Sequence, residues 1–297
     1  MEPQLLIDNN RYLARAISLV ENNHPDGLAL LKKLPFNTKT PVLGITGPPG
    51  AGKSSIVNAL INEALKQDMK VGVLAVDPTS PFNFGSLLGD RVRMADHFNN
   101  DRVYIRSLAT RGSLGGLSAK IYEITDIMRH AGFDLIIIET VGVGQSEVEI
   151  AGLADTTAVV LVPEAGDEVQ TIKSGIMEIA DIFIVNKSDR DGADIFVKNL
   201  KALVHQRPAD KGEIPVIKTV ATTGEGISTF LKAVEAHNIL QRDNDRHLHL
   251  LFDKAWHLIQ NEKMKLVDRT LLLENLKTAA NKTGFNLYQY IQVYTNG

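Results

Sequence analysis

The run GPPGAGKS, residues 47–54, constrains the fold of this 297-residue chain more than any other stretch. It fits the G-x-x-x-x-G-K-S/T spacing of a phosphate-binding loop, in which glycines let backbone N–H groups face the phosphates. An apolar run over 42–45 precedes it and a helical pattern over 55–66 follows it, so the loop would lie at the positive N-terminus of a helix. Spacing and context predict a site for a nucleoside triphosphate and argue against the alternative, an ordinary glycine-rich turn.

The side chains of this loop predict particular contacts with the ligand. Lys53 would reach the β- and γ-phosphates and is a candidate catalytic residue, and the Ser54 hydroxyl would be a ligand of Mg²⁺. The expected nucleotide-binding residues of the loop are Gly47, Pro48, Pro49, Gly50, Ala51, Gly52, Lys53, Ser54 and Ser55.

Composition describes an ordinary globular protein and excludes several kinds of site. The net charge of −3 gives no reason to expect a nucleic-acid partner. Because the chain has no cysteine, it has no disulfides, no thiolate metal sites and no Cys nucleophile. The N-terminus lacks the pattern of a signal peptide, and no apolar run approaches membrane-spanning length, so we expect a cytoplasmic protein that does not associate with membranes.

Short apolar runs alternate with helical stretches over residues 41–240, which predicts an α/β fold with a doubly wound, mostly parallel sheet. Residues 1–40 are expected to form a helical N-terminal extension and residues 241–297 a helical C-terminal arm. In such sheets, ligands bind outside the carboxyl ends of the strands. The expected strands are Val42–Thr46, Val71–Val76, Val103–Ser107, Leu135–Glu139, Thr157–Val162, Ile182–Val185 and Val216–Lys218.

Carboxylates lie at or after the ends of two expected strands, where they suit a magnesium site. Asp77 and then Asp90 follow the second strand, and Glu139 ends the fourth. Because Mg²⁺ prefers hard oxygen ligands, these three side chains and Ser54 are the expected metal ligands, directly or through water. A helix-capping Asp77 and a solvated Asp90 are equal alternatives.

The residues after the fourth strand resemble the D-x-x-G turn of GTPases, with Glu139 in place of the Asp. Gly142 can offer its N–H to the γ-phosphate, and the turn from Gly142 to Gln145 could sense whether that phosphate is present. Gln145 is a candidate for orienting the attacking water. No general base is evident, so slow hydrolysis is expected of the isolated protein.

The run from Asn186 to Asp189 follows the sixth strand and fits the N-K-x-D guanine-specificity motif. The Asp189 carboxylate can accept hydrogen bonds from guanine N1–H and the 2-amino group together, whereas adenine has neither donor there. Asn186 would support the loop, Lys187 would lie along the base, and the Ala221 N–H would contact the guanine oxygen. The motif predicts GTP rather than ATP; the alternative is a plain Asn/Asp turn.

These motifs lie in longer phrases that resemble the methylmalonyl-CoA mutase-associated GTPases, the MeaB/ArgK family of SIMIBI-class P-loop GTPases. The phrases cover most of residues 11–240, whereas residues from about Gln241 onward match the family poorly. Asn83-Phe84-Gly85 and Pro163-Glu164 depart from the usual Thr-Gly-Gly and Pro-Gly. The matching phrases are ARAISLVE (14–21), GITGPPGAGKSS (44–55), AVDPTSPF (75–82), LGDRVRM (88–94), TRGSLGGL (110–117), ETVGVGQSE (139–147), AGDEVQTIKSGIMEIADI (165–182) and VNKSD (185–189).

The resemblance implies a Mg²⁺-dependent GTPase that acts as a chaperone for a B12-dependent acyl-CoA mutase, gating adenosylcobalamin loading and protecting the mutase. It implies GTP and GDP as ligands and Lys53, Gln145 and Arg93 as residues that serve hydrolysis. It also implies that Gln170 and Lys173 belong to a partner-coupling switch, and that the C-terminal arm forms a homodimer. Packing of that arm on the chain's own GTPase domain is the alternative.

Three other functions are left open. A metallochaperone GTPase of the same class would need Cys and His clusters, and this chain has no cysteine. A kinase of a periplasmic amino-acid-binding protein, the older label of the family, would need a base for the substrate hydroxyl, and none is evident. A binding module without turnover would be distinguished by measuring GTP hydrolysis.

Overall fold

The computed structural model contains two compact units, Met1–His247 and Leu248–Gly297. The residues that the structure describes are 2–7, 9–35, 37, 39–77, 94–109, 120–140, 149–163, 177–205, 214–241, 246–264, 267–282 and 284–295. None of the described helices combines the length and hydropathy that crossing a bilayer requires.

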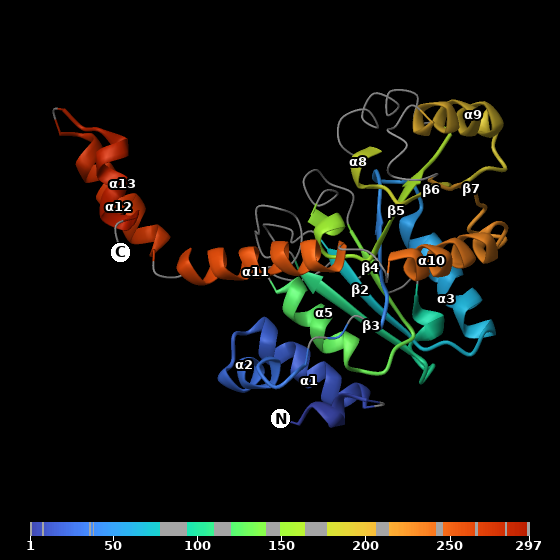
Figure 1. Ribbon diagram of the computed structural model, residues 1–297, viewed down its shortest axis with the longest axis horizontal. Helices are drawn as coiled ribbons and strands as arrows, with labels where there is room; N and C mark the ends of the chain where they lie inside the picture. The colour runs from blue at the N-terminus through green and yellow to red at the C-terminus, as the bar shows by residue number, and fades with distance from the viewer. Residues whose placement is uncertain are drawn as a thin grey trace. The chain divides into compact units, whose positions relative to one another are not determined.

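A seven-stranded sheet forms the centre of the first unit, and its described strands all pair in parallel in the order β3-β2-β4-β1-β5-β6-β7 (Figure 1). All seven expected strands are present, each within two residues of its expected ends. The strand order reverses beside β1, so the segment that follows β1 lies where such sheets bind ligands. The strands are β1 (Val42–Thr46), β2 (Val71–Asp77), β3 (Val103–Ala109), β4 (Leu135–Glu139), β5 (Thr156–Leu161), β6 (Ile182–Val185) and β7 (Val216–Lys218).

Helices cover both faces of this sheet (Figure 1). Successive side chains of a strand point to opposite faces, so Val42 packs in the core on one side and Leu43 in the core on the other. Burial on both faces explains why the strands are continuous apolar runs. One face carries α3 (Lys53–Lys66) and α10 (Ile227–Gln241), and the other carries α1 (Asn10–Glu21), α2 (Pro25–Leu31), α5 (Ile121–Arg129) and α9 (Ala193–Val204).

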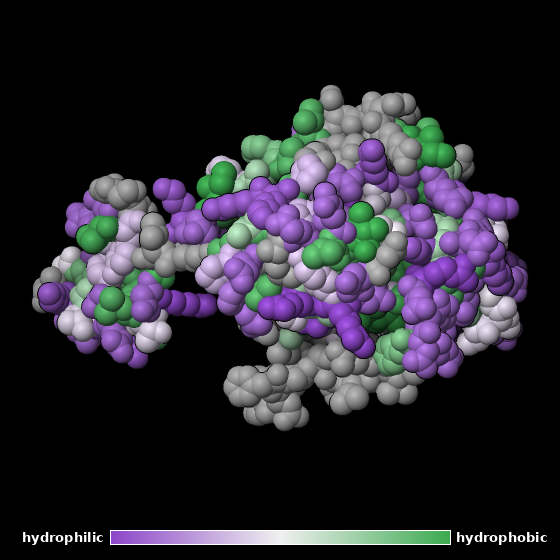
Figure 2. Space-filling view, turned by 90° about the horizontal axis from the view of Figure 1, so that it is seen from below, coloured by the Kyte–Doolittle hydropathy of each residue, from purple (hydrophilic) through white to green (hydrophobic). Residues whose placement is uncertain are grey.

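The N-terminal helices are part of the core of the first unit. Leu13, Ile17 and Val20 of α1 are buried in the same cluster as residues of α5, β2 and β4. The Asn9 side chain caps α1 by accepting a hydrogen bond from the Tyr12 N–H. The face of the first unit seen in Figure 2 is mainly hydrophilic, with scattered hydrophobic spots. The short turns are η1 (Pro3–Leu6), η2 (Ala95–His97), η3 (Ile150–Gly152) and α8 (Met177–Ile179).

The second unit contains three helices among its described residues: α11 (Arg246–Met264), which begins just before the unit boundary, α12 (Arg269–Ala280) and α13 (Leu287–Thr295). Asp268 caps α12 by accepting hydrogen bonds from the N–H groups of Thr270 and Leu271. None of the unit's described side chains is fully buried. The rings of Phe252 and Trp256 stack on α11 with centroids 6.3 Å apart, and both remain more than half exposed.

Candidate nucleotide-binding site

The phosphate-binding loop joins the carboxyl end of β1 to the first residue of α3, as the motif predicts. Two of its glycines are required by close packing as well as by positive φ angles. A Cβ on Gly47 would lie 2.1 Å from the Val160 carbonyl oxygen, and a Cβ on Gly52 would lie 2.4 Å from Asn186 Nδ2. The loop therefore rests directly on β5 and on the residue that follows β6.

Lys53 folds back over the loop that precedes it. Its buried ammonium donates to the carbonyl oxygens of Gly47, at 2.8 Å, and Pro48, at 3.0 Å. A charged donor bonds more strongly to an anion than to a neutral carbonyl. A phosphate group in the loop could therefore replace these bonds.

The end of β4 brings a carboxylate to the start of α3. Ser54 Oγ donates to Glu139 Oε1 over 2.7 Å, and the two residues are only 7% and 5% exposed. Register explains the contact, because Glu139 lies beside Ile45 on the neighbouring strand and α3 begins just after that strand. Asp77 ends β2 at the same edge of the sheet, and its side chain lies outside the described residues.

A second link between β4 and β1 lies on the opposite face of the sheet. The Thr140 N–H donates to the Ile45 carbonyl oxygen at 3.0 Å, and Thr140 Oγ1 donates to Thr46 Oγ1 at 3.0 Å. Both threonines are buried. The residue before the phosphate loop is thus bonded to the residue that follows Glu139.

Asn186 links the predicted guanine-specificity loop to the phosphate loop. Its Nδ2 donates to the Ala51 carbonyl oxygen at 2.9 Å, and its Oδ1 accepts from the Ala221 N–H at 3.2 Å. Lys187 adds a second link, because its ammonium donates to the Gly50 carbonyl oxygen at 2.9 Å. Asp189, at the end of the same motif, is exposed. Three segments that are distant in sequence therefore form one hydrogen-bonded site.

A cavity of about 470 Å³ opens beside this network, within the volume range of small-molecule sites. Ser54 and Ser55 line it at the start of α3, and the loop from Ala221 to Gly224 lines it from the end of β7. Asn58 and Asn62, further along α3, also line it. The Ala221 N–H that would contact a guanine oxygen is bonded to Asn186 here, so a base would have to share or replace that bond.

Several predicted site residues cannot be placed in this geometry. Arg93, Asp90, Gly142, Gln145, Gln170 and Lys173 lie outside the described residues. Their expected roles remain predictions.

The sequence motifs did not identify four residues that the structure brings into the site or next to it. Thr46 and Thr140 each adjoin a motif residue at a strand end, and that position was the only available signal. Asn58 lies on α3, one turn beyond the phosphate-loop motif. The Asn58 Oδ1 is 2.8 Å from Nε2 of His97. No sequence pattern indicates His97.

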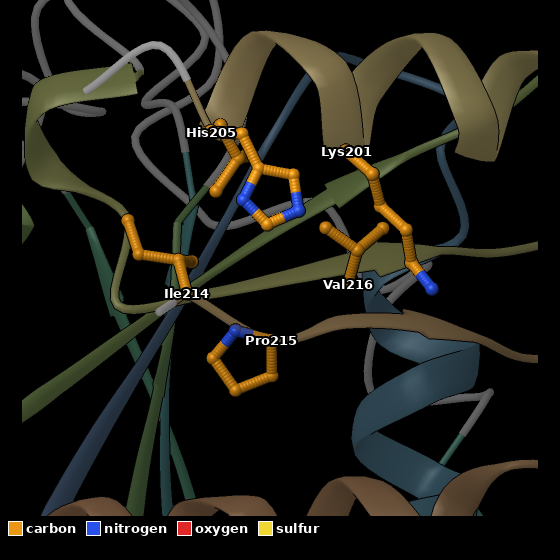
Figure 3. A pocket seen from close by; sticks show the side chains of 6 residues that line it. Lys201, His205, Ile214, Pro215 and Val216 are labelled. Carbon is orange, nitrogen blue, oxygen red and sulfur yellow. The ribbon is translucent and has the colours of Figure 1, made fainter. Parts of the chain in front are cut away.

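A second cavity, of about 430 Å³, lies between the end of α9 and the start of β7 (Figure 3). Lys201 and His205 project from α9 on the side of Pro215 and Val216. Because β7 begins there, the cavity lies at the amino ends of the strands, opposite the phosphate loop, and is separate from the site above. Its described lining is Lys201, Val204, His205, Ile214, Pro215 and Val216.

Comparison with known proteins identifies the family. A Pyrococcus horikoshii protein described as a GTPase is 48% identical over 234 residues, which are 77% of this chain and 74% of that protein. The Caenorhabditis briggsae protein named methylmalonic aciduria type A homolog, mitochondrial, is 42% identical over 203 residues, 63% of this chain and 49% of that one. The crystal structure of a LAO/AO transport system kinase shares the fold, with a TM-score of 0.70 at 24% identity over 99% of this chain and 94% of that chain.

The family match extends over nearly the whole chain. Residues 13–272 match the family described as methylmalonyl Co-A mutase-associated GTPase MeaB. The matched range includes the phosphate loop, the Asn186–Asp189 motif, all of α11 and the start of α12. The family match therefore extends past Gln241, beyond the phrases recognised in the sequence. The chain therefore belongs to the family of methylmalonyl-CoA mutase-associated GTPases.

Proposed function

We propose that this protein is a Mg²⁺-dependent GTPase that acts as a chaperone for a B12-dependent acyl-CoA mutase. The observation that carries the nucleotide assignment is the Asn186 side chain, which bonds to Ala51 of the phosphate loop and to Ala221 of the predicted base-binding loop. One buried amide thereby joins the elements that would hold the two ends of GTP. Residues 41–240 would be the GTPase domain, residues 1–40 its helical extension and residues 241–297 the arm.

GTP would bind with its phosphates over residues 47–55 and its base between Lys187 and the loop at Ala221. Asp189 would select guanine through N1–H and the 2-amino group, because adenine would leave the carboxylate without donors. The cavity beside Ser55 and Ala221 supports this placement.

The donor set near the phosphate loop fits Mg²⁺. The Ser54 hydroxyl and the Glu139 carboxylate supply hard oxygens 2.7 Å apart, and Asp77 ends a strand at the same edge. We assign Ser54, Asp77, Asp90 and Glu139 as the ligands, directly or through water. When bound, the ion would neutralise charge on the β- and γ-phosphates.

Hydrolysis would proceed by in-line attack of water on the γ-phosphorus. The new bond joins the water oxygen to phosphorus as the bond to the β–γ bridging oxygen breaks, and GDP leaves with that oxygen. The Lys53 ammonium would stabilise the charge on the phosphate oxygens. Gln145 would orient the water and Arg93 would assist. Because the sequence contains no evident general base, turnover would be slow without the partner.

The family name supports a mutase as the partner. We propose that Gln170 and Lys173 report the state of the nucleotide to that enzyme. We also propose a homodimer through the arm, since Phe252, Trp256 and Ile259 of α11 keep more than half of their surface exposed. The protein would act in the cytoplasm, where GTP is available.

Co-purification with candidate mutases tests this function. The tagged chain is mixed with a purified B12-dependent acyl-CoA mutase in the presence of a non-hydrolysable GTP analogue, GDP or no nucleotide. We expect a complex whose affinity depends on the nucleotide and an increase in GTP hydrolysis when the mutase is added. Failure of every B12-dependent mutase to form a complex in any nucleotide state would refute the chaperone role.

The alternative function is that of a kinase, as the name of the structurally similar LAO/AO transport system kinase suggests for that protein. The two functions differ in the fate of the γ-phosphate. With γ-labelled GTP or ATP, we expect the label in free phosphate only. Label on an amino-acid-binding protein would favour the kinase.

A further inference from the structure

Asn58 presents a polar side chain to the cavity beside the phosphate loop. It lies on α3 one helical turn after Ser54, and both residues line the same cavity. Its Oδ1 lies 2.8 Å from Nε2 of His97, which comes from the short turn η2. Among the described residues, Asn58 Nδ2 has no hydrogen-bond partner, so its two N–H donors are available to a ligand.

His97 is well suited to fix the orientation of this amide. It is only 4% exposed. Burial lowers the pKa of the imidazole, against the opposing effect of the neighbouring Asp96 carboxylate. A neutral ring that carries its proton on Nε2 donates to Asn58 Oδ1, and the amide group then turns its NH₂ away from His97.

The position of Asn58 on α3 indicates which part of a nucleotide it would meet. A phosphate-binding loop holds the phosphates at the helix N-terminus, where the Ser55 N–H lies. Asn58 follows Ser55 by one turn on the same side of the helix, and Ala221, which would contact the base, also lines the cavity. The ribose joins the phosphates to the base, so it lies between these two ends.

We propose that Asn58 binds the ribose hydroxyls of GTP and that His97 is its positioning residue. This inference rests on the proposed function, because it requires a guanine nucleotide in this cavity. It adds a preference for nucleotides that carry the ribose hydroxyls, through the amide N–H donors of a residue outside the sequence motifs. The alternative is that the hydrogen bond between Asn58 and His97 only holds η2 against α3 and has no role in binding.

Nucleotide affinities separate these two roles. The dissociation constants of GTP and 2′,3′-dideoxy-GTP are measured for the full chain, for Asn58→Ala and for the control Asn62→Ala, which alters the same cavity further along α3. The wild type is expected to prefer GTP. Asn58→Ala is expected to weaken GTP binding by about 3- to 10-fold, as for the loss of one hydrogen bond, and to leave dideoxy-GTP binding unchanged. Asn62→Ala should retain the preference.

Two variants of the histidine test the positioning. His97→Phe keeps a buried ring without the donor, and it should reduce the preference for GTP as Asn58→Ala does. His97→Gln retains an N–H donor and should preserve the preference. If the hydrogen bond between Asn58 and His97 is only structural, His97→Phe would change the affinities for GTP and dideoxy-GTP equally.

The outcomes also separate this inference from the proposed function. If the wild type binds no guanine nucleotide, the proposed function fails. If the wild type binds GTP and dideoxy-GTP equally, or if Asn58→Ala weakens both to the same extent or neither, the ribose contact is wrong while the nucleotide site stands.

Discussion

Charged side chains have different roles at the two edges of the central sheet. Those at the amino edge stabilise the fold, whereas those at the carboxyl edge are placed to bind a ligand. At the amino edge, the Asp155 carboxylate accepts from Arg129 at 2.8 and 3.0 Å and from the Val42 N–H at 2.8 Å. At the carboxyl edge, the Lys53 ammonium bonds to neutral loop carbonyls, and Ser54 bonds to Glu139. Opposite charges at the amino edge satisfy each other and fix the starts of strands. Bonds at the carboxyl edge can be exchanged for bonds to an anion and a cation.

The largest effect on activity is expected from Lys53 at the carboxyl edge. Lys53→Ala removes the charge that would stabilise the transferred phosphoryl group, so GTP hydrolysis should fall by about 10²- to 10³-fold. Thermal unfolding of the variant is measured alongside, to establish that it folds. Single-turnover hydrolysis measures the effect, and Lys198→Ala, an exposed lysine on α9, is the control. Equal rates in Lys53→Ala and wild type would end the assignment of this loop as the catalytic site.

At the amino edge, the expected effect is on stability alone. The side chains of Arg129 and Asp155 are only 10% and 6% exposed. Arg129→Met would leave a buried carboxylate without its cation and should cost about 3–5 kcal/mol of unfolding free energy. Urea denaturation measures this cost, while the GTP affinity of the folded variant should equal that of wild type.

A matched exposed pair provides the control for this prediction. Arg102 bonds to Asp68, and these side chains are 39% and 94% exposed. Arg102→Met should therefore cost less than about 1 kcal/mol. Weakened GTP binding by folded Arg129→Met would show that the two edges are coupled and do not act independently.

The smallest effect among these predictions is on stability and concerns the hydroxyl groups of Thr46 and Thr140, next to the phosphate loop. Thr140→Val leaves the buried Thr46 hydroxyl without its donor and should cost about 1–3 kcal/mol. The double variant Thr46→Val with Thr140→Val removes both groups and should be closer to wild type than the single variant. Denaturation of the wild type, the two single variants Thr46→Val and Thr140→Val, and the double variant gives the coupling energy. Additive losses would mean that the two hydroxyls act independently.

The strands could be predicted from the sequence because the sheet is buried on both faces. Each strand is therefore a short apolar run between turn residues, and all seven lie where expected. The position of the phosphate loop and of Asn186 followed from motif spacing, which fixes residues at strand ends. The α/β class and the helical ends of the chain are confirmed as well.

The remaining site residues could not be predicted, because their partners are distant in sequence. Thr140 meets Thr46 only because β4 lies beside β1 in a particular register. His97 of η2 lies within hydrogen-bond distance of Asn58 of α3, and no sequence pattern links these two elements. Phe252, Trp256 and Ile259 are exposed at helical spacing on α11, and spacing alone does not say what covers such a face.

Nucleotide affinities of the wild type and of an Asp189 variant test whether Asp189 recognises guanine. The wild type should bind GTP and GDP with Mg²⁺ and ignore ATP. Asp189→Asn should lose at least about 100-fold in GTP affinity and gain affinity for xanthosine triphosphate, because the Asn amide can donate to the carbonyl that replaces the 2-amino group of guanine. Equal binding of ATP and GTP by the wild type, or unchanged GTP binding by Asp189→Asn, would show that Asp189 does not select guanine.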